Sequence, residues 1–184
     1  DTKIKMTILR TSENKTFETE VTRKNIDVQT VSGELLENNI GYIKITEFDR
    51  VTYNQYANTF NELKNKGAKR LIIDLRNNPG GLLDVVVKIT NSLVPKGIIT
   101  YVEDKNGEKT YEYSDESYIN LPLVILVNGS SASASEVLSG AVKDFGVGKL
   151  VGEKTYGKGV VQNIFKLSDD SGIKVTIAKY YTPK

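Results

Sequence analysis

The 184-residue sequence contains no histidine and no cysteine. Without histidine, a Ser-His-Asp triad cannot form and the commonest metal ligand is missing. Without cysteine, there is no thiol nucleophile, no disulfide, no thiolate zinc site and no iron–sulfur cluster. We therefore expect no metal and no cofactor, and any chemistry must use serine, threonine, lysine, tyrosine, carboxylates and backbone amides.

An excess of one charge and long apolar runs are also missing. The sequence has 25 lysines and arginines against 23 aspartates and glutamates, a formal charge of +2. Nucleic-acid-binding domains usually carry a large basic excess, so we expect no nucleic-acid partner. No apolar run approaches the roughly 20 residues that span a bilayer. The chain opens on Asp1, which is not a natural start, so we interpret the sequence as a fragment of a longer protein.

Short apolar runs alternate with helical patterns through most of the sequence. The runs at 71–75 and 121–127 are nearly continuous, as in strands that are covered on both faces of a parallel sheet. Apolar residues at helical spacing follow each run, over 82–93 and 134–145. This order predicts an α/β fold. Further strands are expected at 3–10, 17–21, 41–45, 98–113 (a hairpin around Asn106-Gly107), 149–151, 160–167 and 173–181, and a further helix at 52–66.

The first candidate site lies after the run at 121–127, in the segment 128–136, Asn-Gly-Ser-Ser-Ala-Ser-Ala-Ser-Glu. Reacting groups of α/β proteins gather at such strand ends. Free N–H groups and the dipole of the following helix favour the negative charge that forms when a serine oxygen attacks. The alternative is a plain helix cap, because Ser133 and Glu136 have the spacing of a capping box, and the local sequence alone favours this alternative.

The second candidate is the segment 152–159, Gly-Glu-Lys-Thr-Tyr-Gly-Lys-Gly. It begins like a phosphate-binding loop, but Gly159 replaces the serine or threonine that would hold Mg²⁺, and a strand pattern follows where such a loop opens into a helix. Nucleotide binding is therefore disfavoured. What remains is Lys158 between two glycines, which is either a solvated surface charge or a constrained side chain.

The third candidate is the segment 74–81, Asp-Leu-Arg-Asn-Asn-Pro-Gly-Gly, which joins an expected strand to an expected helix. A turn of this kind presents unpaired N–H groups at the helix start. Taken alone, the segment is equally an ordinary strand-to-helix turn.

Together the three segments resemble the C-terminal processing peptidases, also called tail-specific proteases. The family's motifs are Asp-Leu-Arg-x-Asn-x-Gly-Gly, Ser-Ala-Ser-Ala-Ser-Glu and Gly-Glu-x-Thr-x-Gly-Lys-Gly-x-x-Gln, and they occur here in this order at 74–81, 131–136 and 152–162. The resemblance covers the chain from about residue 41 to its end. It implies an α/β core like that of crotonases or Clp peptidases, with stacked β-sheets and flanking helices, that acts as a serine endopeptidase on proteins or peptides with exposed C-termini.

The family uses a Ser/Lys dyad, which the resemblance places on Ser133 and Lys158, 25 residues apart (158 − 133). It also implies that Gln162 orients the lysine. Such a lysine acts as a base only while it is neutral, and burial with few anionic neighbours favours the neutral form. We therefore expect activity to rise toward mildly alkaline pH.

The resemblance implies an oxyanion hole as well. Its N–H groups fall on Ala134 and on either Gly80 or Gly81, between which the sequence does not choose. An aspartate eleven residues after the serine occurs in part of the family and falls on Asp144. We expect Asp144 to be a supporting group at most, and otherwise a surface carboxylate.

The resemblance divides the sequence into two parts. Residues 1–23 are similar to the closing strands of a PDZ domain, and residues 24–184 to a peptidase core that is truncated at its C-terminus. The loop that binds a substrate's terminal carboxylate is missing, so we expect the fragment to be weakly active or inactive. The family implies a location in the bacterial periplasm or on the outer face of the cell membrane, with which the lack of cysteine is compatible. A homo-oligomer of the intact protein is left open, and the alternative function is a non-catalytic ligand- or peptide-binding module on the same fold.

Overall fold

The computed structural model describes residues 2–24, 26 and 28–184. Asp1, which carries the interpretation of the sequence as a fragment, lies outside the described residues, as do residues 25 and 27 beside the expected boundary after residue 23. No helix in the described part of the chain has both the length and the apolar character needed to cross a membrane.

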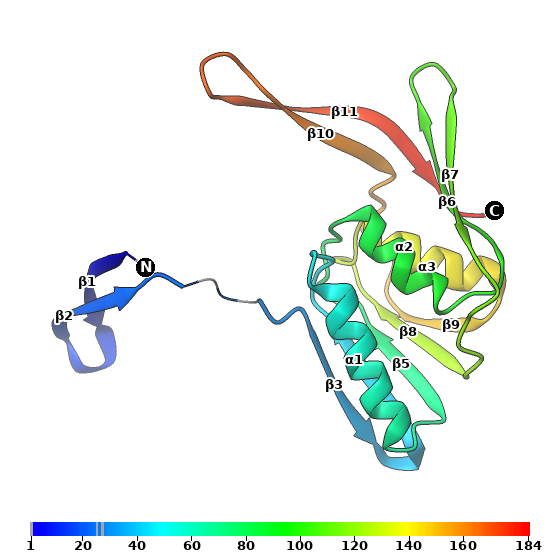
Figure 1. The fold of residues 1–184 in the computed structure, drawn as a ribbon, viewed down its shortest axis with the longest axis horizontal. Helices are drawn as coiled ribbons and strands as arrows, with labels where there is room; N and C mark the ends of the chain where they lie inside the picture. The colour runs from blue at the N-terminus through cyan, green and yellow to red at the C-terminus, as the bar shows by residue number, and fades with distance from the viewer. Residues whose placement is uncertain (1, 25, 27) are drawn as a thin grey trace.

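A five-stranded sheet forms the centre of the molecule, in the order β3-β4-β5-β8-β9 (Figure 1). Its strands are β3 (Val31–Leu36), β4 (Ile40–Ile45), β5 (Arg70–Asp74), β8 (Leu123–Val127) and β9 (Gly148–Gly152). The pairs from β4 to β9 are parallel, and β3 is antiparallel to β4. The expected parallel sheet is therefore confirmed, whereas β3 was not expected.

Three helices cover this sheet, in agreement with the expected α/β class. They are α1 (Thr52–Asn65), α2 (Leu83–Asn91) and α3 (Ala134–Phe145). Helix α1 packs on β3 and β4, and α2 packs on α3. Helix α3 contacts both β9 and β6, a strand of the second sheet, so it lies between the two sheets.

The second sheet is antiparallel, in the order β10-β11-β6-β7. Its strands are β6 (Gly97–Asp104), β7 (Lys109–Ser114), β10 (Val160–Lys166) and β11 (Gly172–Tyr181). The outer half of the β10–β11 hairpin projects from the core (Figure 1), and the side chains there are exposed. The hairpin predicted around Asn106-Gly107 is confirmed as β6–β7, and the two strands expected at 160–167 and 173–181 pair with one another as β10–β11.

The N-terminal residues form a separate two-stranded antiparallel sheet of β1 (Lys3–Arg10) and β2 (Lys15–Thr22), as expected. A short 3₁₀ turn joins the two strands (Thr11–Glu13), and a second one, at Glu37–Asn39, precedes β4. Figure 1 shows the β1–β2 hairpin standing apart from the core. A lone hairpin is marginal in water, and the assignment of these strands to a PDZ domain stays a prediction.

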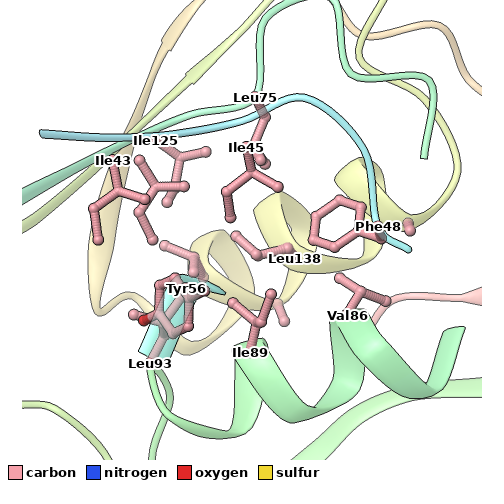
Figure 2. Packing of buried hydrophobic residues seen from close by; sticks show 14 of the residues in the cluster. Ile43, Ile45, Phe48, Tyr56, Leu75, Val86, Ile89, Leu93, Ile125 and Leu138 are labelled. Atoms are coloured by element: carbon pink, nitrogen blue, oxygen red, sulfur yellow. The ribbon is translucent and has the colours of Figure 1, made fainter. Parts of the chain in front are cut away.

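The core lies between the central sheet and the helices (Figure 2). Side chains of the sheet, such as Ile43 and Ile125, meet Ile89 of α2 and Leu138 of α3, and all four are fully buried. Full burial of each such side chain stabilises the fold by about 1.5–3 kcal/mol. This packing fixes the carboxyl ends of β5 and β8, where the first and third candidate segments begin.

Candidate active site

A cavity of about 190 Å³ lies beside the N-terminus of α3, where the segments that follow β5, β8 and β9 meet. Its lining includes Gly81, Ser133, Ala134, Lys158, Gln162 and Tyr180. Five of the seven residues that the sequence singled out therefore share one cavity. Gly80 is buried and does not line this cavity, and Asp144 does not line it either.

Ser133 has a backbone conformation that is unusual for a residue with a side chain, with φ 56° and ψ −114°. A conformation of this kind is strained, and in native proteins it is kept mostly at functional sites. The two flanking serines are bound to the backbone of the third segment, since Ser131 Oγ donates to the Leu75 carbonyl at 2.8 Å and Ser135 Oγ to the Asn78 carbonyl at 3.1 Å. Ser133 is the serine of this segment that lines the cavity.

Glu136 connects the first and second candidate segments. Its carboxylate accepts hydrogen bonds from the N–H groups of Ser133 (2.8 Å), Gly157 (2.6 Å) and Lys158 (2.9 Å). The bond to Ser133 is half of the capping box that the sequence indicated, so capping and a site role are not exclusive here. The two bonds to the lysine loop had no signal in the sequence, because spacing along the chain does not show which loop faces a capping glutamate.

Lys158 is partly buried and lies two residues before β10, so the glycine-rich segment opens into a strand and not into the helix of a phosphate-binding loop. Within the described residues, no carboxylate oxygen lies within 4.0 Å of Lys158 Nζ, and no hydrogen bond joins Nζ to Ser133 Oγ. Catalytic hydrogen bonds are often long before a substrate is bound. The side chains of Ser133 and Lys158 line the same cavity without a hydrogen bond between them.

Of the two residues expected to support the dyad, Gln162 lines the cavity and Asp144 does not. The Gln162 amide lines the cavity and donates to Thr176 Oγ1 at 3.4 Å rather than to Lys158. Asp144 lies in the last turn of α3, where it accepts the backbone N–H of Lys184 at 3.0 Å. Eleven helical residues span about 16 Å, so the structure does not bring Asp144 to Ser133.

The structure distinguishes the two candidate glycines. The N–H of Gly80 donates to Asn78 Oδ1 at 2.9 Å, whereas the N–H groups of Gly81 and Ala134 donate no hydrogen bond to any described residue. Gly81 and Ala134 also line the cavity, and Gly80 does not. Two unpaired donors at one cavity, beside a serine, are what an oxyanion requires.

Tyr180 is a cavity residue that the sequence analysis missed. Tyr180 lies at the end of β11, and its hydroxyl donates to the backbone carbonyl of Lys158. Burial raises the Tyr180 pKa, and the nearby Glu136 charge raises it further, so the hydroxyl stays protonated and able to donate. Because Tyr180 is one of several tyrosines in strand patterns, its spacing gave no signal.

Asp74 ends β5 beneath the third segment. Its buried carboxylate accepts two hydrogen bonds from the Arg76 guanidinium (2.9 and 2.6 Å) and one from the Tyr42 hydroxyl (2.6 Å). Burial alone would raise the Asp74 pKa, but the hydrogen bonds from Arg76 and Tyr42 outweigh it and hold the pKa below its usual value. This ion pair anchors the start of the turn that carries Gly80 and Gly81.

The fold and the cavity define an α/β protein with a histidine-free serine site, and the comparisons identify the family. The model of peptidase family S41 matches residues 39–184, so the chain belongs to that family. No cluster of three or more metal-binding side chains occurs in the described part of the chain.

Three similar proteins illustrate the relationship. The carboxyl-terminal-processing protease of Synechocystis sp. is 39% identical over 189 aligned residues, which cover 100% of this chain and 44% of that protein. The carboxy-terminal processing protease CtpA of Bacillus subtilis is 38% identical, over 98% of this chain and 39% of that protein. A solved photosystem II D1 C-terminal processing protease is 35% identical with a TM-score of 0.76, over 94% of this chain and 48% of that one. The chain thus spans less than half the length of these relatives.

Proposed function

We propose that the protein is a serine endopeptidase that cleaves proteins or peptides near their C-termini, with Ser133 as nucleophile and Lys158 as base. One observation carries the proposal: a single cavity of a histidine-free chain contains a strained serine, a lysine and two unpaired N–H groups. The names of the relatives, which are C-terminal processing proteases, support the same reaction.

In this mechanism, Ser133 Oγ attacks the scissile carbonyl carbon while its proton passes to the neutral Nζ of Lys158. The N–H groups of Gly81 and Ala134 bind the resulting oxyanion. The Lys158 ammonium then gives its proton to the leaving amine as the C–N bond breaks. A water molecule attacks the acyl-serine by the same route and releases the new carboxylate. Gln162 is proposed to orient Lys158, and Asp144 is left without a role at the cavity.

The test is cleavage of an unfolded protein by the full-length enzyme. Ser133→Ala and Lys158→Ala should each abolish cleavage, because one removes the nucleophile and the other the base. The matched controls are Ser130→Ala and Lys154→Ala, exposed neighbours in the same two segments, which should keep wild-type rates. Unchanged cleavage by either dyad variant would overturn the mechanism, and bound peptide without cleavage by the wild type would favour the binding module instead.

The remaining proposals concern the intact protein. Residues 1–23 are proposed to be the closing strands of a PDZ domain that binds substrate tails, and their separate hairpin supports this. We also propose a location outside the cytoplasm, in the periplasm or on the outer face of the cell membrane. Activity of the full-length enzyme should rise toward mildly alkaline pH, because the proposed mechanism requires a deprotonated lysine, and an acidic optimum would contradict a lysine base.

A further inference from the structure

Asn78 lies in the Gly-Gly segment beside the cavity but does not itself line the cavity. It is fully buried, at 0% exposure. Its Nδ2 donates to the carbonyl of Ile45 at 2.9 Å, and its Oδ1 accepts the N–H of Gly80 at 2.9 Å. Both ends of the side-chain amide are therefore used inside the protein, one toward the end of β4 and one toward the Gly-Gly turn.

The backbone of Asn78 extends these connections to the nucleophile segment. Its carbonyl accepts the N–H of Ala132 at 3.1 Å and the hydroxyl of Ser135 at 3.1 Å. Ala132 immediately precedes Ser133, and Ser135 follows it by two residues. One buried residue thus joins three segments: the end of β4, the Gly-Gly turn and the start of α3.

The side-chain bond to Gly80 decides how the Gly-Gly turn faces the cavity. Asn78 Oδ1 takes the N–H of Gly80, whereas the next residue, Gly81, lines the cavity and its N–H donates to no described residue. The turn also lies close to the nucleophile, since a Cβ added to Gly80 would be 2.8 Å from Ser133 Cβ and 3.0 Å from the Ala134 nitrogen. A small rotation of this turn therefore moves one oxyanion donor relative to the other.

We propose that Asn78 is the positioning residue of the oxyanion hole: its buried amide fixes the Gly80–Gly81 turn so that the Gly81 N–H and the Ala134 N–H converge. The proposal rests on the proposed serine-peptidase function. The plainer alternative is an Asx turn that contributes stability alone, since asparagine side chains often bond the N–H two residues ahead. The two differ in what the loss of Asn78 changes: the transition state in the first case, only the folded fraction in the second.

The discriminating measurement compares a peptide ester with its thionoester, in which sulfur replaces the carbonyl oxygen. Sulfur accepts hydrogen bonds weakly, so an oxyanion hole favours the ester strongly. In the full-length enzyme, Asn78→Ala should lower kcat for the ester by about 10- to 100-fold, with KM within about twofold, because misplaced groups cost rates of this order. The thionoester should lose less, so the ester-to-thionoester ratio should fall.

Thr30→Val is the matched control for the loss of a buried hydrogen bond. The Thr30 hydroxyl is buried at 1% exposure, bonds Thr52 Oγ1 at 2.7 Å and lies outside the cavity lining. This variant should lose comparable stability with kcat and the ester-to-thionoester ratio unchanged, when rates are normalised to the folded fraction. Equal losses for ester and thionoester in Asn78→Ala, or the same kinetic losses in Thr30→Val, would overturn the proposal.

Asn78→Asp covers the case in which the alanine variant does not fold. A protonated aspartic acid can keep both bonds, whereas the carboxylate faces the Ile45 carbonyl without a proton to donate. Its kcat relative to the wild type should therefore fall as pH rises through the ionisation of the new carboxyl group, and a pH-independent ratio near one would overturn the proposal. Ser133→Ala run beside these variants keeps the two questions apart, because its full activity would remove the proposed function itself.

Discussion

The loop that carries Lys158 is held by a carboxylate of α3, so the base should be displaced when that carboxylate loses its charge. Glu136→Gln is the smallest such change, because it keeps the size of the side chain and replaces one oxygen by an NH₂ group. In the wild type one carboxylate oxygen accepts the N–H groups of Ser133 and Lys158, and the other accepts that of Gly157. The best placement of the glutamine oxygen keeps the first two bonds and turns a donor toward Gly157.

The magnitude follows from these three bonds. Loss of the bond to Gly157, an exposed residue, costs about 1.5 kcal/mol, the low end for a bond to a charged group. The two retained bonds become neutral and weaken by roughly 0.5–1 kcal/mol each. The sum is about 2.5–3.5 kcal/mol, which lowers kcat by about 70- to 400-fold if it is expressed in the transition state.

The assay is steady-state cleavage of a peptide by the full-length enzyme, with urea unfolding measured in parallel. We expect kcat to fall within that range and KM to change little, because Glu136 binds the loop backbone of Lys158 and does not line the cavity. Glu153→Gln is the control, since Glu153 is an exposed carboxylate at the start of the same segment, and it should leave kcat unchanged. A Glu136→Gln enzyme with wild-type kcat would show that the loop keeps its place without this carboxylate.

Two further changes test the turn after β5. Gly81→Ala should lower both kcat and stability, because the added Cβ would lie 2.1 Å from the Phe48 carbonyl oxygen at a φ of +146°. Gly107→Ala is the control, because its Cβ would meet nothing within 4 Å at a φ of +84°. This control should lose only about 1 kcal/mol of stability in urea unfolding, from backbone strain, and no activity. Asp74→Asn should destabilise the protein most at neutral pH. The Asp74 pKa is depressed in the folded state, so its contribution is present above the unfolded value of about 4 and is lost as pH falls through the folded value. Urea unfolding at several pH values should therefore show the difference from the wild type shrinking in acid, and a constant difference would contradict a role for the Arg76 pair.

The central strands could be predicted because β5 and β8 are buried on both faces and consist of continuous apolar runs. Strand β3 could not be predicted in this way, because Gly33 and Glu34 interrupt its apolar pattern. The structure gives the reason for the glycine: a Cβ at Gly33 would lie 2.4 Å from Thr59 Cγ2 of α1. The residue that conceals the strand in the sequence is the one that lets α1 pack against it.

The candidate site shows a similar division. Motif spacing predicted Ser133 and Lys158, and the structure places both at one cavity. The choice between Gly80 and Gly81 depends on the hydrogen bond of one buried amide, which no spacing encodes. Asp144 is the opposite case. Eleven residues along a continuous helix place it about 16 Å from Ser133, the proposed nucleophile, so helical geometry alone argues against the role that its spacing suggested.

The first turn of α3 determines the geometry of the proposed dyad more than the β10–β11 hairpin that follows the lysine. This turn supplies Ser133 as the proposed nucleophile, the Ala134 N–H and the Glu136 carboxylate that binds the backbone of the lysine loop. The loop is also joined to this region by the Tyr156 N–H, which donates to the carbonyl of Ser131 at 3.0 Å. The backbone hydrogen bonds of Tyr156, Gly157 and Lys158 therefore join the lysine loop to the same turn that carries the proposed nucleophile and oxyanion donor. The relative positions of the proposed base and nucleophile thus depend on this turn and not on the exposed outer half of the β10–β11 hairpin.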